Sequence, residues 1–322
     1  MKKSEIIYKV FSENLHNVCK VLKFKFDEEY RDEGYICPLS FKIHSRTGLS
    51  NEYDDQLTIE HIPPESLNGK GLCLTNKISN SQAGHSLDLA LQNHINQREF
   101  NERISSLKTK VYIENVKMTG ELDFTDKNNP KFNFSTKKWH EGNKRAVNKI
   151  NEEGKFKVRF SFLKDNWKTQ VSFLRTAYLF AFSHLGYSLL FGATKVVNPN
   201  YDLIRQQVLA PEKKIVNDII ILNKDLEGIS LGVNIVHEPY ECRSLLVVFE
   251  LETVNKKWRY GVFLPGPDDY GFKAIEKIKE NFENNLKFNF KFTHIPKLDI
   301  KSLSDSQFYY NSWEKINGFY NE

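Results

Sequence analysis

The sequence predicts an α+β fold with mostly antiparallel strands, in which a small N-terminal domain at residues 1–108 precedes a larger α+β domain at residues 109–322. The 322 residues are enough for about two domains. Hydrophobic residues make up 40% of the chain and aromatic residues 13%, which excludes a disordered polypeptide. Near residues 105–110 the pattern changes from helical periodicity to the alternating segments typical of an antiparallel sheet.

The N-terminal domain is predicted to begin with an amphipathic helix. Apolar residues recur three and four positions apart over residues 4–22. Residues 56–61 form a short strand that two prolines end, and residues 72–75 form a second strand after a glycine-containing turn. A helix should then begin near Asn80 or Ser81, capped by one of those side chains. The predicted order is therefore strand, loop, strand, helix.

The C-terminal domain is predicted to combine strands and helices. Strands are expected near residues 111–124, 131–135, 155–162, 229–236, 244–253, 258–264 and 286–293, and helices near residues 168–187, 200–209 and 269–284. Arg175 and Arg205 fall on two of these apolar helices, where a charge needs a partner or a ligand. A buried salt bridge is the simplest explanation for each.

Hydropathy, the N-terminal segment and the cysteines together indicate the cellular compartment of the protein. The most apolar stretches, at residues 171–193 and 244–251, are interrupted by charged and polar residues, and the mean hydropathy is -0.52, so no membrane span is expected. The N-terminus runs into alternating charges without a small-residue cleavage site, so no secretory signal is expected. The four cysteines contain no close pair, which predicts a reduced, cytoplasmic protein.

Positive charge is concentrated in one segment. The chain has a net charge of +5, yet residues 131–175 alone hold 12 basic against 4 acidic residues, interleaved with aromatic side chains. Such a segment is typical of a surface that follows phosphates and stacks bases. The alternative is a solvated face over an aromatic core. The candidate nucleic-acid contacts, here and beside the predicted strands, are Lys70, Lys77, Lys137, Lys138, Lys144 and Arg145.

The most informative motif lies within residues 35–91. Its polar residues follow one order, which is Glu60-His61 before two prolines, a turn with glycine at residues 68–71, Cys73-x-x-Asn76, Asn80, and Gly84-His85-x-Leu87-Asp88. This order resembles the HNH endonuclease family, whose members carry a ββα-metal finger. The resemblance implies that the predicted strand, loop, strand and helix form such a finger. It is confined to this window of the chain.

The resemblance also implies roles for five residues. His61 would be the general base, since an imidazole with a pKa of about 6.5 is mostly neutral at pH 7. Glu60 would be a metal ligand, and Asn80 a metal ligand or an orienting residue. His85 would bind metal or phosphate, and Asp88 would orient His85. The implied cofactor is a divalent ion, Mg²⁺ or alternatively Mn²⁺, which holds the phosphate and stabilises the leaving oxygen.

Two structural questions accompany these roles. Neighbouring residues of an ideal strand point to opposite faces, but the prolines after His61 allow the alternation to relax, so that Glu60 and His61 both face the helix. The alternative for His61 and His85 is an ordinary core or surface histidine, and for Asp88 a solvated or capping residue.

The sequence departs from the family at the positions of a structural zinc knuckle. Relatives often carry two Cys-x-x-Cys pairs around the catalytic strands, and the matching positions here are Cys37 with Ser40 and Asn76 with Ser79. Three of the four thiolates are missing, and hydroxyl and amide groups are poor substitutes on Zn²⁺. We therefore expect no structural zinc.

The leading hypothesis is a metal-dependent HNH endonuclease that hydrolyses DNA phosphodiester bonds, with a C-terminal domain that binds nucleic acid or gates activity. A role in bacterial restriction or phage defence fits by analogy. The alternative is a non-cleaving nucleic-acid or nucleotide sensor with a degenerate finger, and a third hypothesis is an enzyme with a different site in the larger domain. An activating protein or small molecule is compatible with each, and the sequence leaves the oligomeric state open.

Overall fold

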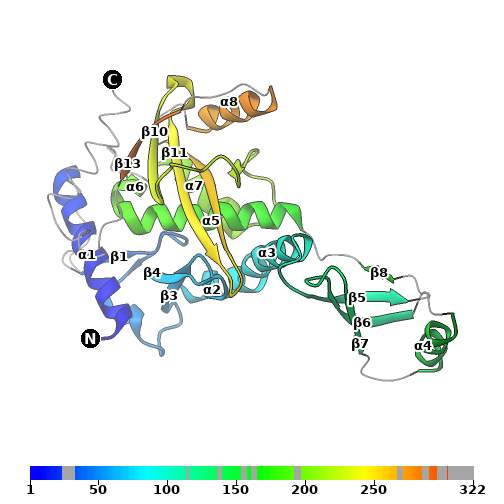
Figure 1. Cartoon of the computed structure of the whole chain (residues 1–322). Coiled ribbons are helices and arrows are strands. Elements are labelled where there is room, and N and C mark those ends of the chain that lie inside the picture. The colour runs from blue at the N-terminus through cyan, green and yellow to red at the C-terminus, as the bar shows by residue number, and fades with distance from the viewer. Residues whose placement is uncertain are drawn as a thin grey trace. The chain divides into compact units, whose positions relative to one another are not determined.

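The computed structural model describes residues 1–23, 33–113, 116–135, 140–153, 158–160, 165–191, 197–266, 271–284, 290–295 and 303 (Figure 1). It is a mixed α+β protein with antiparallel sheets. The chain forms two compact units. Residues 1–88 and 167–322 make up unit 1, and residues 89–166 make up unit 2.

These units differ from the two domains expected from the sequence. The first part of the chain does not stand alone, because it packs on helices that lie more than a hundred positions later. The ring of Phe11 stacks on Phe182 with centroids 5.0 Å apart, and the hydroxyl of Tyr187 donates to the carbonyl of Ile36 at 2.8 Å. Residues 89–166 are therefore an insertion between two halves of one unit.

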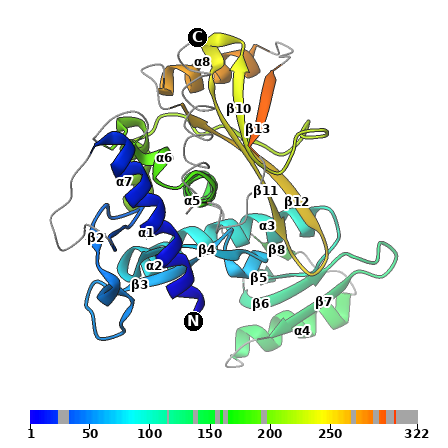
Figure 2. The same ribbon diagram turned by 90° about the vertical axis from the view of Figure 1, so that its left-hand side faces the viewer.

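Unit 1 begins with the predicted amphipathic helix, α1 (Lys3–Leu22). Its apolar face buries Phe11, Leu15 and Val18, and the helix contacts α6 (Tyr187–Phe191) (Figure 2). Two short strands follow, β1 (Tyr35–Ile36) and β2 (Ile43–His44), and the 3-10 helix η2 (Arg46–Leu49). The expectation of one buried helical face at the N-terminus is confirmed.

The predicted strand, loop, strand, helix order is also present. β3 (Leu57–Ile62) pairs antiparallel with β4 (Lys70–Asn76), with the 3-10 helix η3 (Glu65–Leu67) between them. The chain continues into α2 (Lys77–Ala83), the π-helical turn η4 (Gly84–Asp88) and α3 (Leu89–Asn101), which belongs to unit 2.

The helix start was predicted in the wrong place. The helix begins at Lys77, not near Asn80 or Ser81. The reason is the side chain of Asn76, whose Oδ1 accepts hydrogen bonds from the backbone N–H groups of Ile78 at 3.0 Å and Ser79 at 3.4 Å. Asn76 thus satisfies the free donors of the first turn directly after the strand.

The C-terminal half of unit 1 is a five-stranded antiparallel sheet between two helices. Its order is β13-β10-β11-β12-β9. The elements are α5 (Asn166–Leu185), α7 (Pro199–Leu209), β9 (Ile221–Leu222), β10 (Gly232–Glu238), the 3-10 helix η5 (Tyr240–Cys242), β11 (Ser244–Glu252), β12 (Lys257–Pro265), α8 (Gly271–Glu283) and β13 (Lys291–Ile295). Side chains such as Leu246 and Phe263 pack on α8, whereas Phe249 and Tyr260 on the other face meet Phe173 of α5.

The long helix α5 lies in the core of unit 1. Its described side chains are buried from Val171 to Leu185, and they include polar ones. Among the helices that the structure describes, none is long and apolar enough to cross a bilayer. On α7, Arg205 pairs with Asp202 at 2.7 Å, so the ion pair expected for that arginine is present, but the Arg205 side chain is 20% exposed and the pair is not buried.

Unit 2 is a four-stranded antiparallel sheet with a helix on one face. The strands are β5 (Leu107–Ile113), β6 (Val116–Asp123), β7 (Lys131–Ser135) and β8 (Val158–Phe160), in the order β7-β6-β5-β8. The helix α4 (Glu141–Glu153) was not predicted from the sequence. Its Ala146 joins Val111, Met118 and Leu122 of the sheet in one hydrophobic cluster.

Candidate functional site

The β3–β4 hairpin carries Glu60 and His61 at an irregularity in its register. Glu60 pairs with Cys73, whereas His61 pairs with Gly71, so the register shifts between them. A β-bulge of this kind interrupts the regular alternation of side chains between the two faces of a hairpin. The irregularity lies at the position where the alternation was expected to relax.

Glu60 is the centre of a buried polar network. Its side chain is only 3% exposed. Oε1 accepts a hydrogen bond from Nη2 of Arg175 at 2.5 Å, and Oε2 accepts one from the Thr75 hydroxyl at 2.9 Å. Arg175 comes from α5 and also donates through Nη1 to Oδ1 of Asp88 at 2.7 Å. The salt bridge expected for Arg175 is confirmed, and its partners are two of the predicted site residues.

Burial and charge act on Glu60 in opposite directions. Burial raises the pKa of the Glu60 carboxyl above its ordinary value of 4.5, while the Arg175 guanidinium and the Thr75 hydroxyl lower it. Asp88, whose side chain is 25% exposed, also raises the pKa of Glu60 through its own charge. Glu60 thus depends on Arg175 to remain ionised in a site that excludes water.

The two candidate histidines lie in more open positions. His61 is half-buried at the end of β3, and no hydrogen bond or ion pair engages its side chain in the described part of the chain. His85 is exposed on η4. Asp88, to which the resemblance assigns the orienting of His85, forms an ion pair with Arg175 through Oδ1 at 2.7 Å.

Asn80 ties the helix α2 to the hairpin. Its Nδ2 donates to the Thr58 hydroxyl at 3.0 Å and to the carbonyl of Ile59 at 3.3 Å. Thr58 shares a hairpin face with Glu60, because the two residues are two positions apart on one strand. Asn80 therefore lies over the hairpin face that carries Glu60.

The carboxylate of Glu60, the first of the predicted metal ligands, is engaged by protein donors in this structure. Both carboxylate oxygens of Glu60 already accept hydrogen bonds from protein donors. Within the ranges that the structure describes, no group of three His, Cys, Asp or Glu side chains gathers closely enough to hold an ion. Asn80 and His85 remain candidate metal ligands. The Glu60 carboxylate expected to join them is bonded to Arg175 and Thr75.

The positions that match the family's zinc knuckle do come together. The buried Cys37 accepts hydrogen bonds at Sγ from the backbone N–H of Ser40 at 3.4 Å and of Asn76 at 3.3 Å. The side chain of Asn76 also donates to Asp55, which pairs with Lys42 at 2.8 Å. The two segments are joined here by one thiol, two amides and an ion pair. This set of groups does not fit Zn²⁺.

The candidate nucleic-acid contacts are spread over both units. Lys70 and Lys77 are exposed on unit 1, and Nζ of Lys70 lies 3.5 Å from Oδ1 of Asn68. Lys144 and Arg145 are exposed on α4 of unit 2, where Lys144 pairs with Glu141 at 3.7 Å. The remaining two, Lys137 and Lys138, lie outside the described residues.

Two functional partners of Glu60 were missed in the sequence. The sequence indicated that Arg175 needs a partner, since it is a charged residue on an apolar helix. It did not indicate which residue that partner is. Thr75 carried none, because its hydrogen bond to Glu60 depends on the strand register.

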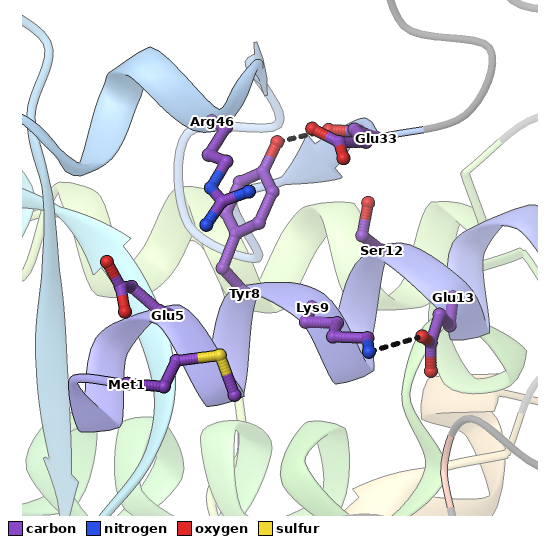
Figure 3. Close-up of a pocket in the computed structure, with 8 residues that line it drawn as sticks. All are labelled: Met1, Glu5, Tyr8, Lys9, Ser12, Glu13, Glu33 and Arg46. Atoms are coloured by element: carbon purple, nitrogen blue, oxygen red, sulfur yellow. Dashed lines mark hydrogen bonds and ion pairs between the residues drawn. The ribbon is translucent and has the colours of Figure 1, made fainter.

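A separate surface hollow lies beside α1 (Figure 3). It has a volume of about 360 Å³ and is lined by Met1, Glu5, Tyr8, Lys9, Ser12, Glu13, Glu33 and Arg46. The hydroxyl of Tyr8 donates to the carbonyls of His44 at 3.0 Å and of Glu33, and Lys9 pairs with Glu13 at 3.8 Å. The predicted site residues do not line this hollow, so it is not the candidate site.

Comparisons with known proteins add no relative. No family model, no curated protein and no solved structure matches this chain. The candidate site is thus defined by the motif at residues 35–91 and by the hairpin and helix that carry it.

Proposed function

We propose that this chain is a metal-dependent endonuclease of the HNH type that hydrolyses DNA phosphodiester bonds. The single observation that carries the proposal is the position of His61, at the end of the first strand of a ββα unit, half-buried and without a hydrogen-bond partner among the described residues. An imidazole in this state is available to take a proton from an attacking water.

Two further observations support the HNH resemblance. The residues that match its zinc knuckle form two pairs, Cys37 with Ser40 and Asn76 with Ser79, which are distant from each other in the sequence. In the structure, Cys37 nevertheless accepts a hydrogen bond from the Asn76 backbone. Asn80 bonds the first strand of the hairpin from the following helix. Both contacts hold the loop, hairpin and helix as one unit, which a finger requires if it is to position a base.

A divalent ion would supply charge neutralisation at the leaving oxygen. The Arg175 guanidinium occupies the carboxylate that the resemblance assigns to this ion, so Arg175 and a metal compete for Glu60. We therefore assign Glu60 no step in the reaction. The metal requirement rests on the resemblance alone. A role in restriction or phage defence rests on it as well.

The deciding experiment compares purified wild type and His61→Ala on supercoiled plasmid and linear duplex, in Mg²⁺, Mn²⁺ or EDTA. His140→Ala is the matched control, because His140 is exposed and lies outside the hairpin. Wild type and control should cleave, EDTA should abolish cleavage, and His61→Ala should lose about 10²- to 10⁴-fold in rate. Equal cleavage by His61→Ala and wild type would refute the role of His61.

A non-cleaving nucleic-acid sensor is the second candidate function. The observation that favours it is the commitment of both Glu60 oxygens to Arg175 and Thr75. Nucleic acid bound by wild type and His61→Ala with equal affinity, without cleavage in any metal, would support this function over the endonuclease.

A further inference from the structure

The positive charge of the chain belongs to unit 2. Residues 89–166 contain 16 basic and 10 acidic side chains, a net charge of +6. The remaining residues, which form unit 1, contain 30 basic and 31 acidic side chains, a net charge of -1. Unit 2 therefore accounts for the whole basic excess of the protein, and its described surface shows where part of that charge lies.

The four-stranded sheet of unit 2 has two different faces. The inner face packs Val111, Met118 and Leu122 against Ala146 of α4. The residues that alternate with these form the outer face, and the basic ones among them are all exposed. They come from every strand: Lys108 and Lys110 of β5, Lys117 of β6, Lys131 of β7 and Arg159 of β8.

An exposed aromatic residue lies at the centre of this outer face. Tyr112 of β5 is 37% exposed. Its register partners are Lys117 on one neighbouring strand and Arg159 on the other. Side chains directly opposite each other in an antiparallel pair have Cβ atoms about 4.5–5.5 Å apart, so the tyrosine ring stands between two cations.

The charge of the outer face is only partly compensated. Its acidic members are Glu121, which accepts a hydrogen bond from Ser106, and Asp123, which accepts from Thr125. In the described ranges, no ion pair engages Lys110 or Lys117.

On α4, by contrast, the lysines have acidic neighbours. Lys144 pairs with Glu141 at 3.7 Å and Lys149 with Glu153 at 3.9 Å. Lys110 and Lys117 on the sheet therefore differ from these two helix lysines, whose charges are paired.

We propose that the outer face of the unit 2 sheet binds single-stranded nucleic acid, with phosphates at Lys110 and Lys117 and a base stacked on Tyr112. A basic surface with an exposed aromatic ring suits an unpaired strand, whose bases are free to stack on side chains. In a duplex the bases stack on one another, so Tyr112 would contribute nothing. The proposal goes beyond the endonuclease activity and does not depend on cleavage.

The test measures binding of the full chain in EDTA, by fluorescence anisotropy with a labelled 20-nucleotide DNA strand and with its duplex. Lys110→Gln/Lys117→Gln should weaken binding to the strand by about tenfold and reduce the slope of log K against log salt by about 1.4, since each lost phosphate contact is worth about 0.7. Lys273→Gln/Lys277→Gln on α8 is the matched control, with two exposed lysines outside unit 2, and should change neither quantity.

Tyr112 separates stacking from charge. Tyr112→Phe should retain binding, whereas Tyr112→Leu, which keeps an apolar side chain in the strand, should lose about 5- to 100-fold on the single strand. Circular dichroism confirms that each variant is folded. An unchanged salt slope in Lys110→Gln/Lys117→Gln, or equal affinity of Tyr112→Leu and wild type for the single strand, would overturn the proposal. A His61→Ala variant that binds normally but does not cleave leaves it intact, so the two proposals fail separately.

Discussion

Arg175→Met removes the cation that links α5 to the hairpin and to η4. Methionine is unbranched and fills much of the same space, so the change acts mainly on charge. It leaves the Glu60 carboxylate buried with the Thr75 hydroxyl as its remaining donor in the network. Asp88 also loses its partner, but its side chain is 25% exposed and can hydrate. The cost therefore falls mainly on Glu60.

Breaking a buried ion pair by removing one partner costs about 3–5 kcal/mol, because the other charge stays buried and uncompensated. We expect Arg175→Met to lose this much free energy of unfolding near pH 8. The double variant Arg175→Met/Glu60→Gln should lose less than the single variant, since its buried amide carries no charge. A double variant at least as unstable as Arg175→Met would show that packing, and not the charge on Glu60, determines the loss.

The loss should depend on pH. Burial already raises the pKa of Glu60, and Arg175 is the first of the groups that oppose the rise. Without Arg175, the pKa of Glu60 in the folded variant rises further above its unfolded value. The folded variant then binds a proton that the unfolded chain releases, so protonation stabilises it. Its instability relative to wild type is greatest above the folded pKa and shrinks as the pH falls towards 4.5.

Urea unfolding followed by circular dichroism at several pH values between 5 and 8 measures this directly, as a shift in midpoint at constant slope. Arg46→Met is the matched control, because Arg46 is exposed, and surface changes are usually within about 0.5 kcal/mol. A destabilisation of Arg175→Met below about 1 kcal/mol at pH 8, or one that grows on acidification, would refute the reasoning.

Two further changes test the packing of the candidate site by thermal or urea unfolding. Asn76→Ala removes the cap of α2 and should cost about 1 kcal/mol, with Ser79→Ala, which leaves the cap in place, as the control; no loss would contradict the cap assignment. Tyr187→Phe removes a buried hydroxyl that bonds both N–H and C=O of Ile36 at 2.8 Å, and should cost about 1–3 kcal/mol; a neutral effect would show that β1 does not need this anchor.

Local patterns were sufficient for much of the fold. The three- and four-residue spacing of apolar side chains located α1, and the two prolines after Ile62 marked the end of β3. The strands β11 and β12 lie within one residue of their predicted bounds, because an apolar run of strand length is a property of the segment itself.

Other features depend on contacts that no local window contains. The helix α4 is mostly polar and buries Ala146 and little else that is apolar, so few apolar residues mark it in the sequence. The start of α2 is set by which of several polar side chains reaches the first-turn N–H groups, and Asn76 does so from the end of a strand. The division into units follows from the packing of Phe11 on Phe182, far apart in the sequence.

Glu60 shows why a motif and a structure can assign one residue differently. A carboxylate buried beside a histidine needs a compensating cation, and either a metal ion or a guanidinium meets that need. The motif at residues 35–91 contains the carboxylate but not the cation. Arg175 supplies the cation from a helix outside the motif. In this structure the charge of Glu60 is therefore compensated by Arg175. The case for catalysis rests on His61 at the end of β3. Its side chain forms no hydrogen bond in the described structure.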